Sequence, residues 1–142
     1  MNLYNTESKL KNFSGCIRIP GVFSLLFLLP IFYADKISIK IIWGITAYFS
    51  FMADYYYAGQ DSDFLAIDRI WAVFVCIYIL CNFISLRSIY LLFLVSFSFT
   101  FYLMSMIAIE KNSLVEYNIY HSLWHIFGAY TGVFINKYLK TN

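Results

Sequence analysis

The stretch that decides the fold is Ser88–Ile109, which reads SIYLLFLVSFSFTFYLMSMIAI and contains no charged side chain. A helix needs about 20 mostly apolar residues to cross the hydrocarbon core of a bilayer. This run reaches that length, and short polar breaks border it on both sides. The sequence therefore predicts a transmembrane helix over these residues.

The rest of the chain repeats this pattern of apolar runs between polar breaks. Of its 142 residues, 61% are hydrophobic and 13% are charged, against about 25% charged in an ordinary soluble domain. We therefore expect an all-α, multi-pass integral membrane protein, a single domain over residues 1–142 with a polar tail at residues 1–17. The five expected transmembrane helices are Ile19–Ala34, Ile39–Tyr57, Ile67–Ile84, Ser88–Ile109 and Tyr117–Leu139. The small net charge of +2 excludes nucleic acid as a partner.

The first apolar run resembles a secretory signal because Lys9, Lys11 and Arg18 precede it. A signal-peptide cleavage site needs small residues, however, and Phe32 occupies one of those positions. We therefore expect an uncleaved first helix. Pro30 lies inside this run and should kink it, since proline lacks a backbone N–H and its ring crowds the preceding turn.

Polar residues within the predicted spans fall on one side of the membrane. Because each span reverses the direction of the chain, the end of the second, the start of the third and the start of the fifth lie in the same leaflet. Ser50 and Asp54 occupy the first of these places, Asp68 the second, and His121 and His125 the third. Ionisable groups are costly inside a bilayer, so they normally face the bundle interior and find partners. We therefore expect these five side chains to converge.

The spacing of these residues indicates a metal site. His121 and His125 are the only histidines of the chain and lie one helical turn apart, which places them on one helix face. Ser50 and Asp54 have the same spacing. Two histidines with one carboxylate form a known zinc arrangement, in which a fourth position stays open for water. An open position is typical of a catalytic site.

Three short motifs resemble those of the CREST superfamily of membrane hydrolases, which includes the alkaline ceramidases and the progestin/adiponectin receptors. They are FSFMAD at 49–54, LAIDRIWA at 65–72 and YHSLWHIFGA at 120–129. Members have a serine and a histidine one turn apart in their second helix, an aspartate in the third and an HxxxH in the last. Two features differ from the family pattern: Asp54 stands where its third histidine should be, and the chain has about five spans instead of seven.

The resemblance implies a zinc-dependent intramembrane hydrolase of a lipid amide, similar to a ceramidase. His121, His125 and Asp54 would be the zinc ligands, since a carboxylate can replace an imidazole at this metal. By the same resemblance, Asp68 would be the general base for the attacking water, and Ser50 would donate to the developing oxyanion. The expected partners are a lipid substrate and the membrane itself.

Other interpretations of the same residues remain. The polar cluster can hold helices together in a non-catalytic structural or receptor-like bundle, because interhelical polar contacts favour one packing without any metal. Asp54 and Asp68 can also be boundary residues that reach water, with Arg69 or Lys111 as partners. Haem ranks last, because two histidines one turn apart cannot occupy opposite axial positions.

Overall fold

The computed structural model describes residues 17–60, 62–86 and 88–141, and over these ranges the chain forms helices and turns without a strand. The expected all-α fold is confirmed, and each predicted apolar run corresponds to one helix or to consecutive helical segments. The predicted polar tail lies, apart from Ile17, outside the described residues. The elements are α2 (Ile19–Ser24), the 3₁₀ turn η1 (Leu25–Leu28), α3 (Leu29–Tyr33), α4 (Ile37–Phe51), the π-helical turn η2 (Met52–Tyr56), α5 (Asp63–Leu86), α6 (Ile89–Glu110) and α7 (Leu114–Thr141).

The first apolar run changes its hydrogen bonding next to Pro30. Proline interrupts the α-helical pattern on its N-terminal side, where it removes one donor and crowds the carbonyl one turn earlier. In the structure the turn η1 separates α2 from α3 at that place, and Pro30 lies in the first turn of α3. The helical path ends at Ala34, whose extended backbone turns the chain toward α4.

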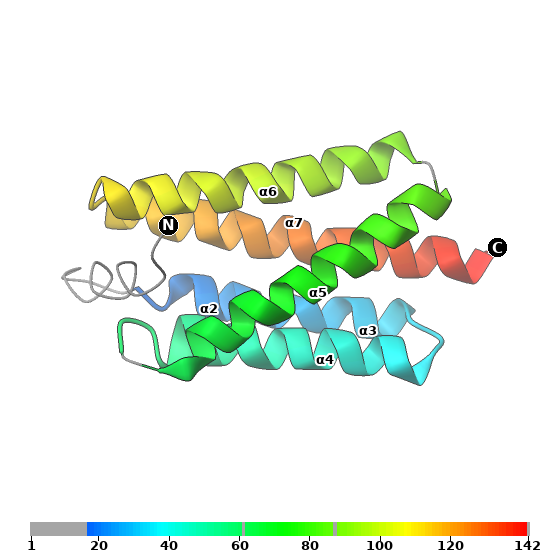
Figure 1. Ribbon diagram of the computed structural model, residues 1–142, viewed down its shortest axis with the longest axis horizontal. Helices are drawn as coiled ribbons and strands as arrows, with labels where there is room; N and C mark the ends of the chain where they lie inside the picture. Colours follow the sequence, from blue (N-terminus) through cyan, green and yellow to red (C-terminus); the bar gives the residue numbers. More distant parts are fainter. Residues whose placement is uncertain (1–16, 61, 87, 142) are drawn as a thin grey trace.

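A tight turn joins α6 to α7 and sets the register between them. Asn112 has a left-handed φ of 54°, a conformation that asparagine tolerates better than most residues. The N–H of Ser113 donates to the carbonyl of Ala108 at 2.9 Å and so satisfies the end of α6. The two helices then run antiparallel and side by side (Figure 1). Residues equally far from the turn therefore face one another across this hairpin.

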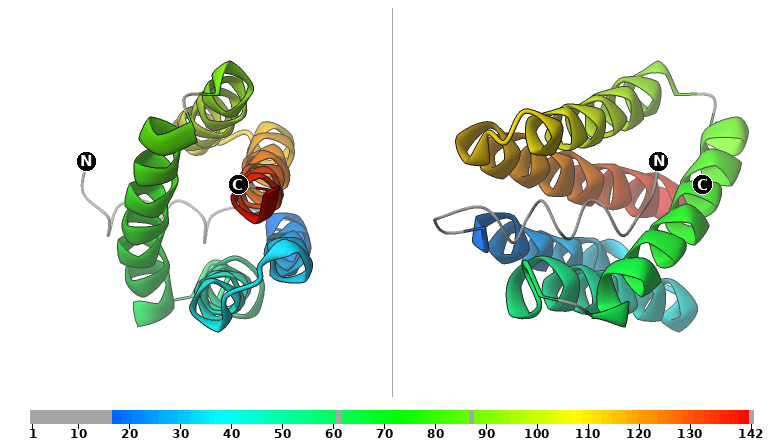
Figure 2. Two further views of the ribbon diagram at one scale, coloured as in Figure 1. Left: turned by 90° about the vertical axis from the view of Figure 1, so that its right-hand side faces the viewer. Right: turned by 60° about the vertical axis from the view of Figure 1, so that its left-hand side comes forward.

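The helices surround a cavity, which α5 closes only in part. Around the bundle follow α6, α7, the pair α2 and α3, and then α4, while α5 crosses obliquely and packs mainly on α4 (Figures 1 and 2). The helices α5 and α6 meet at their connection and then diverge (Figure 1). The cavity has a volume of about 400 Å³. Its apolar lining residues from α5 and α6 include Val75, Ile79, Phe83, Leu92, Val95 and Phe99.

Two helices of the described chain are long and apolar enough to cross a membrane. They are α5, over Asp63–Ile84, and α6, over Ile89–Glu110. The helix that spans Ile19–Tyr33 is apolar but shorter, and α4 has only 15 residues. Length and composition therefore support two of the five expected spans.

Candidate metal centre

Three side chains converge near the end of the bundle where α7 begins. Oδ2 of Asp54, on η2, lies 3.2 Å from Nε2 of His121 and 3.0 Å from Nε2 of His125, both on α7. Each residue offers one ligand atom, and these atoms lie within 4.8 Å of one another. The structure thus brings together the three residues that the sequence proposes as metal ligands.

The position of Asp54 depends on the wide turn η2. In a π-helical turn the backbone bonds reach five residues back, as from the N–H of Tyr57 to the carbonyl of Met52 at 2.9 Å. Helix α2 packs directly against this turn at Gly21. A Cβ at that position would lie 2.5 Å from Cβ of Tyr55 and 2.7 Å from the backbone carbonyl carbon of Asp54. Only a residue without a side chain permits so close an approach.

The two histidines share one face of α7, as their spacing predicts. Their ring centroids are 4.9 Å apart. His125 is 1% exposed and His121 is 12% exposed, so the ring of His121 lies nearer the end of the bundle. The ring of Phe27 meets His125 nearly at right angles, with centroids 5.3 Å apart. His125 is therefore fixed among buried aromatic groups.

Ser50 and Asp68 form a separate pair beside this group. The hydroxyl of Ser50, on α4, donates to Oδ1 of Asp68, on α5, at 2.6 Å. Asp68 does not belong to the three-residue ligand group; it accepts from Ser50, which precedes Asp54 by one turn in the sequence. The five predicted site residues are thus split into a group of three and a pair.

One neighbour of the histidines was not predicted from the sequence. Ser105 on α6 is fully buried, and its Oγ lies 3.3 Å from Nδ1 of His121. The signal that identifies it is the register of the α6–α7 hairpin, because Ser105 and His121 are equally far from Ser113 in its turn. Within the described ranges, Nδ1 of His125 is buried and has no hydrogen-bond partner.

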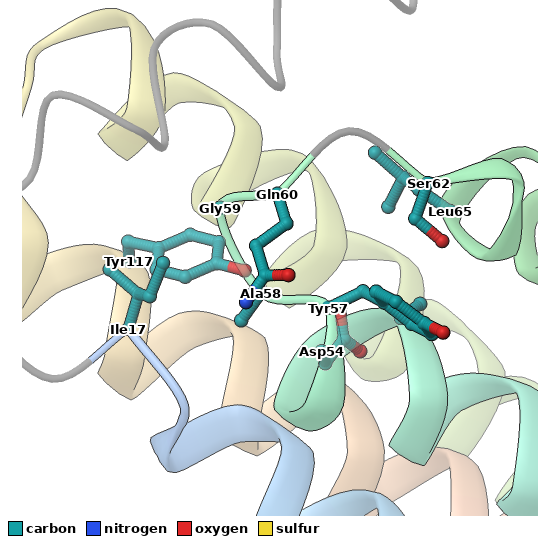
Figure 3. A pocket seen from close by; sticks show the side chains of 10 residues that line it. Ile17, Asp54, Tyr57, Ala58, Gly59, Gln60, Ser62, Leu65 and Tyr117 are labelled. Atoms are coloured by element: carbon teal, nitrogen blue, oxygen red, sulfur yellow. The ribbon is translucent and has the colours of Figure 1, made fainter.

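Two pockets flank the site. A small one, with room for about 20 Å³, is lined by Asp54, Tyr117 and residues of the 57–60 turn that follows η2 (Figure 3). The large cavity of about 400 Å³ is lined instead by Ser50 and Asp68 among mostly apolar residues. Asp54 and the Ser50–Asp68 pair therefore line different pockets.

The donor set fits a metal ion. Two imidazoles and one carboxylate are ligands that zinc and several other transition metals accept. Asp54 is 6% exposed and contacts the two histidines rather than Arg69 or Lys111, the partners that a boundary residue would have. The buried Asp54, His121 and His125 group can therefore hold a metal ion.

Comparisons with known proteins found no match, whether the chain was set against family models, curated proteins or solved structures. The resemblance to the CREST superfamily therefore rests on three short motifs, at 49–54, 65–72 and 120–129. Any function assigned to the chain depends on the geometry and chemistry of the site itself.

Proposed function

We propose that this protein is a zinc-dependent intramembrane hydrolase of a lipid amide. The observation that carries the proposal is the convergence of Asp54, His121 and His125 within 4.8 Å, next to a serine and aspartate pair that lines an apolar cavity. The metal group would activate water, the pair would move its proton, and the cavity would hold the hydrocarbon part of the substrate.

Membrane placement is supported by the outer surface of the bundle. In water, large contiguous apolar patches are rare on a monomer. Helix α5 nevertheless exposes a long apolar side with no charged residue between Ile70 and Ile84. Its exposed side chains include Ile70, Val73, Phe74, Ile77 and Ile84. We place all five helical runs in the bilayer, because the shorter ones also expose large apolar side chains, such as Val22, Phe32 and Ile37.

Zinc is the metal proposed for the ligand group. The set of two histidines and one carboxylate leaves a fourth coordination position open, as in catalytic zinc sites. Bound zinc supplies Lewis acidity, which makes a water ligand acidic enough to lose its proton near neutral pH. The small pocket lined by Asp54 and the 57–60 turn would hold water near this position.

The pair Ser50 and Asp68 supplies the proton chemistry. Asp68 would accept the proton of the attacking water and return it to the nitrogen of the leaving amine as the C–N bond breaks. The products are then a fatty acid and an amine. The Ser50 hydroxyl now donates to Asp68 at 2.6 Å, and turning toward the cavity would direct it at the developing oxyanion.

The large cavity supports a lipid substrate. It begins at Ser50 and Asp68 and continues between the apolar faces of α5 and α6. An acyl chain placed there would put its carbonyl end beside the polar pair. The acyl chain would lie among the apolar side chains of these two helices that line the cavity.

One observation favours the non-catalytic alternative. Asp54 already contacts both histidines at hydrogen-bond distance, and these contacts link η2 to α7 without a metal. A bundle that uses them only for packing would bind no zinc. The same residues would then be needed for folding instead of for metal.

Zinc content distinguishes the proposed zinc hydrolase from the packing alternative. The protein is purified in detergent without chelators, and zinc per folded chain is measured by elemental analysis for the wild type, His121→Ala and His125→Ala. We expect about one zinc in the wild type and none in either variant, with folding retained as judged by size exclusion and circular dichroism.

Thr131→Ala is the matched control, because its buried hydroxyl donates only within α7, to the carbonyl of Phe127. A wild type without zinc, or variants that unfold while Thr131→Ala does not, would favour the packing alternative.

A further inference from the structure

Ser105 is a polar neighbour of the ligand group that was not predicted from the sequence, and it contacts a ring nitrogen of His121. Its hydroxyl donates to the backbone carbonyl of Tyr102 in the preceding turn at 2.7 Å. A serine hydroxyl has one hydrogen and two acceptor lone pairs. With its hydrogen on Tyr102, Ser105 can act toward any other neighbour only as an acceptor.

This arrangement requires a hydrogen on Nδ1 of His121 if the ring is to bond to Ser105. Nδ1 of His121 lies 3.3 Å from Oγ of Ser105, so the contact is a hydrogen bond only if Nδ1 is the donor. A neutral imidazole has a single N–H, and its other nitrogen keeps a free lone pair. That other nitrogen is Nε2, the atom that faces Asp54 at 3.2 Å.

We propose that Ser105 is a positioning residue that holds His121 as the Nδ1–H tautomer and so turns the Nε2 lone pair toward the metal. The inference rests on the proposed zinc site. A lone pair and a carboxylate oxygen at this distance repel each other unless a cation or a proton lies between them. The contact with Ser105 therefore prepares the ring to bind a cation that Asp54 shares.

The second histidine has no such support. Nδ1 of His125 is buried without a partner in the described part of the chain, and the ring is oriented by packing on Phe27. Metal-binding histidines generally donate their other N–H to a second group, and loss of that group typically weakens metal binding by about 10–100-fold. Ser105 is thus the side chain through which this effect can be tested.

The test compares Ser105→Ala with Ser98→Ala. Ser98 is a matched control because it lies on the same helix, is buried, and donates across the hairpin to the carbonyl of Trp124 at 3.4 Å without touching a histidine. The zinc dissociation constant of each detergent-purified variant is measured by competition with a chelator, with zinc alone as the probe. Ser105→Ala should bind zinc about 10–100-fold more weakly than the wild type, and Ser98→Ala should stay within about twofold.

A spectroscopic measurement reads the tautomer directly and needs no metal. Proton–nitrogen correlation spectra of ¹⁵N-histidine-labelled protein distinguish a hydrogen on Nδ1 from one on Nε2. In the metal-free wild type, Nδ1 of His121 should carry a hydrogen. In Ser105→Ala the tautomer with hydrogen only on Nε2 should gain population, and in Ser98→Ala the spectrum should match the wild type.

The two measurements separate failure of this inference from failure of the proposed function. If the wild type binds zinc but Ser105→Ala and Ser98→Ala have equal affinity, or if His121 carries its hydrogen only on Nε2, the role of Ser105 is refuted and the zinc site stands. If the wild type binds no zinc while Ser105→Ala still changes the tautomer, Ser105 orients the ring and the proposed function fails.

Discussion

Two polar sites on helix α7, one at Asn136 and one at His121 and His125, differ in how completely their atoms are paired. Toward the far end of the helix, Asn136 is 3% exposed and donates to the carbonyl of Pro30 at 2.9 Å. Its Oδ1 accepts from the hydroxyl of Tyr78 at 3.3 Å. The amide thus joins α7 to α3 and α5 with a donor facing an acceptor in each contact. Helix packing accounts for this site.

The group formed by Asp54, His121 and His125 is built differently. One carboxylate oxygen faces two imidazole nitrogens at 3.0 and 3.2 Å, and the far nitrogen of His125 has no partner among the described residues. Three potential ligand atoms therefore share one small space. Burial and polarity are common to both sites, so what distinguishes the candidate metal centre is this surplus of potential ligand atoms.

The largest expected effect comes from changing Asp54. Asp54→Ala should remove zinc and activity, whereas Asp54→His, which restores the residue of the resembled family, should keep zinc bound. Asp54→Asn has a similar shape but is a poorer ligand, so its zinc affinity should fall between the two. The measurement is zinc content at matched folded fraction.

A carboxylate that serves only for packing gives a different result. It predicts the same zinc content in all three Asp54 variants, with histidine no better than alanine. That outcome would make the group at Asp54 equivalent to the site at Asn136 and would remove the contrast between them.

The second prediction concerns Asp68, which lies outside the three-residue ligand group. Asp68→Asn should lower turnover of a lipid amide by about 10²–10⁴-fold, the usual contribution of a general base. Zinc affinity should stay near that of the wild type, because Asp68 contacts Ser50 rather than the histidines. Turnover and chelator competition are measured on the same preparation, and loss of zinc in this variant would assign Asp68 to the metal instead.

The sequence was sufficient for the helices and for the convergence of Asp54, His121 and His125. Apolar length predicts each helical run, and the spacing of His121 and His125 predicts their common face. The π-helical turn that carries Asp54 was not predictable, because it depends on the close approach of α2 at Gly21. Ser105 was missed for a related reason: its role follows from the register of two helices, and a serine in an apolar run has no distinctive pattern of its own.

The third prediction uses Gly21 to disturb the position of Asp54 without changing a ligand. In Gly21→Ala the new methyl group would meet the backbone of η2, which must shift. Overpacking of this kind typically costs about 1–3 kcal/mol of stability. Zinc affinity should also fall by about 10-fold, the lower end of the range for groups that orient metal ligands.

Gly44→Ala is the matched control for this substitution. It is also a helical glycine, but its Cβ would have only Cδ1 of Ile31 nearby, at 3.9 Å. Its zinc affinity and thermal stability in detergent should match the wild type. Equal zinc affinity in Gly21→Ala and Gly44→Ala would show that the fit between α2 and η2 does not position Asp54.

The smallest expected effect on the metal site comes from Asn136, although its loss should destabilise the bundle. Asn136→Ala removes the hydrogen bond from Tyr78 and leaves the carbonyl of Pro30 with only the N–H of Ala34, and each lost hydrogen bond costs about 0.5–1.5 kcal/mol. The melting temperature in detergent should therefore fall. Zinc affinity should not change, because Asn136 lies about three turns of α7 beyond His125 and contacts none of the three ligand residues.

Tyr78→Phe is the milder variant: it removes only the longer of the two contacts of Asn136 and should reduce stability less. If Asn136→Ala instead weakened zinc binding as strongly as Gly21→Ala, the two polar sites of α7 would be coupled, and the whole bundle rather than its local contacts would determine the geometry of the ligand group.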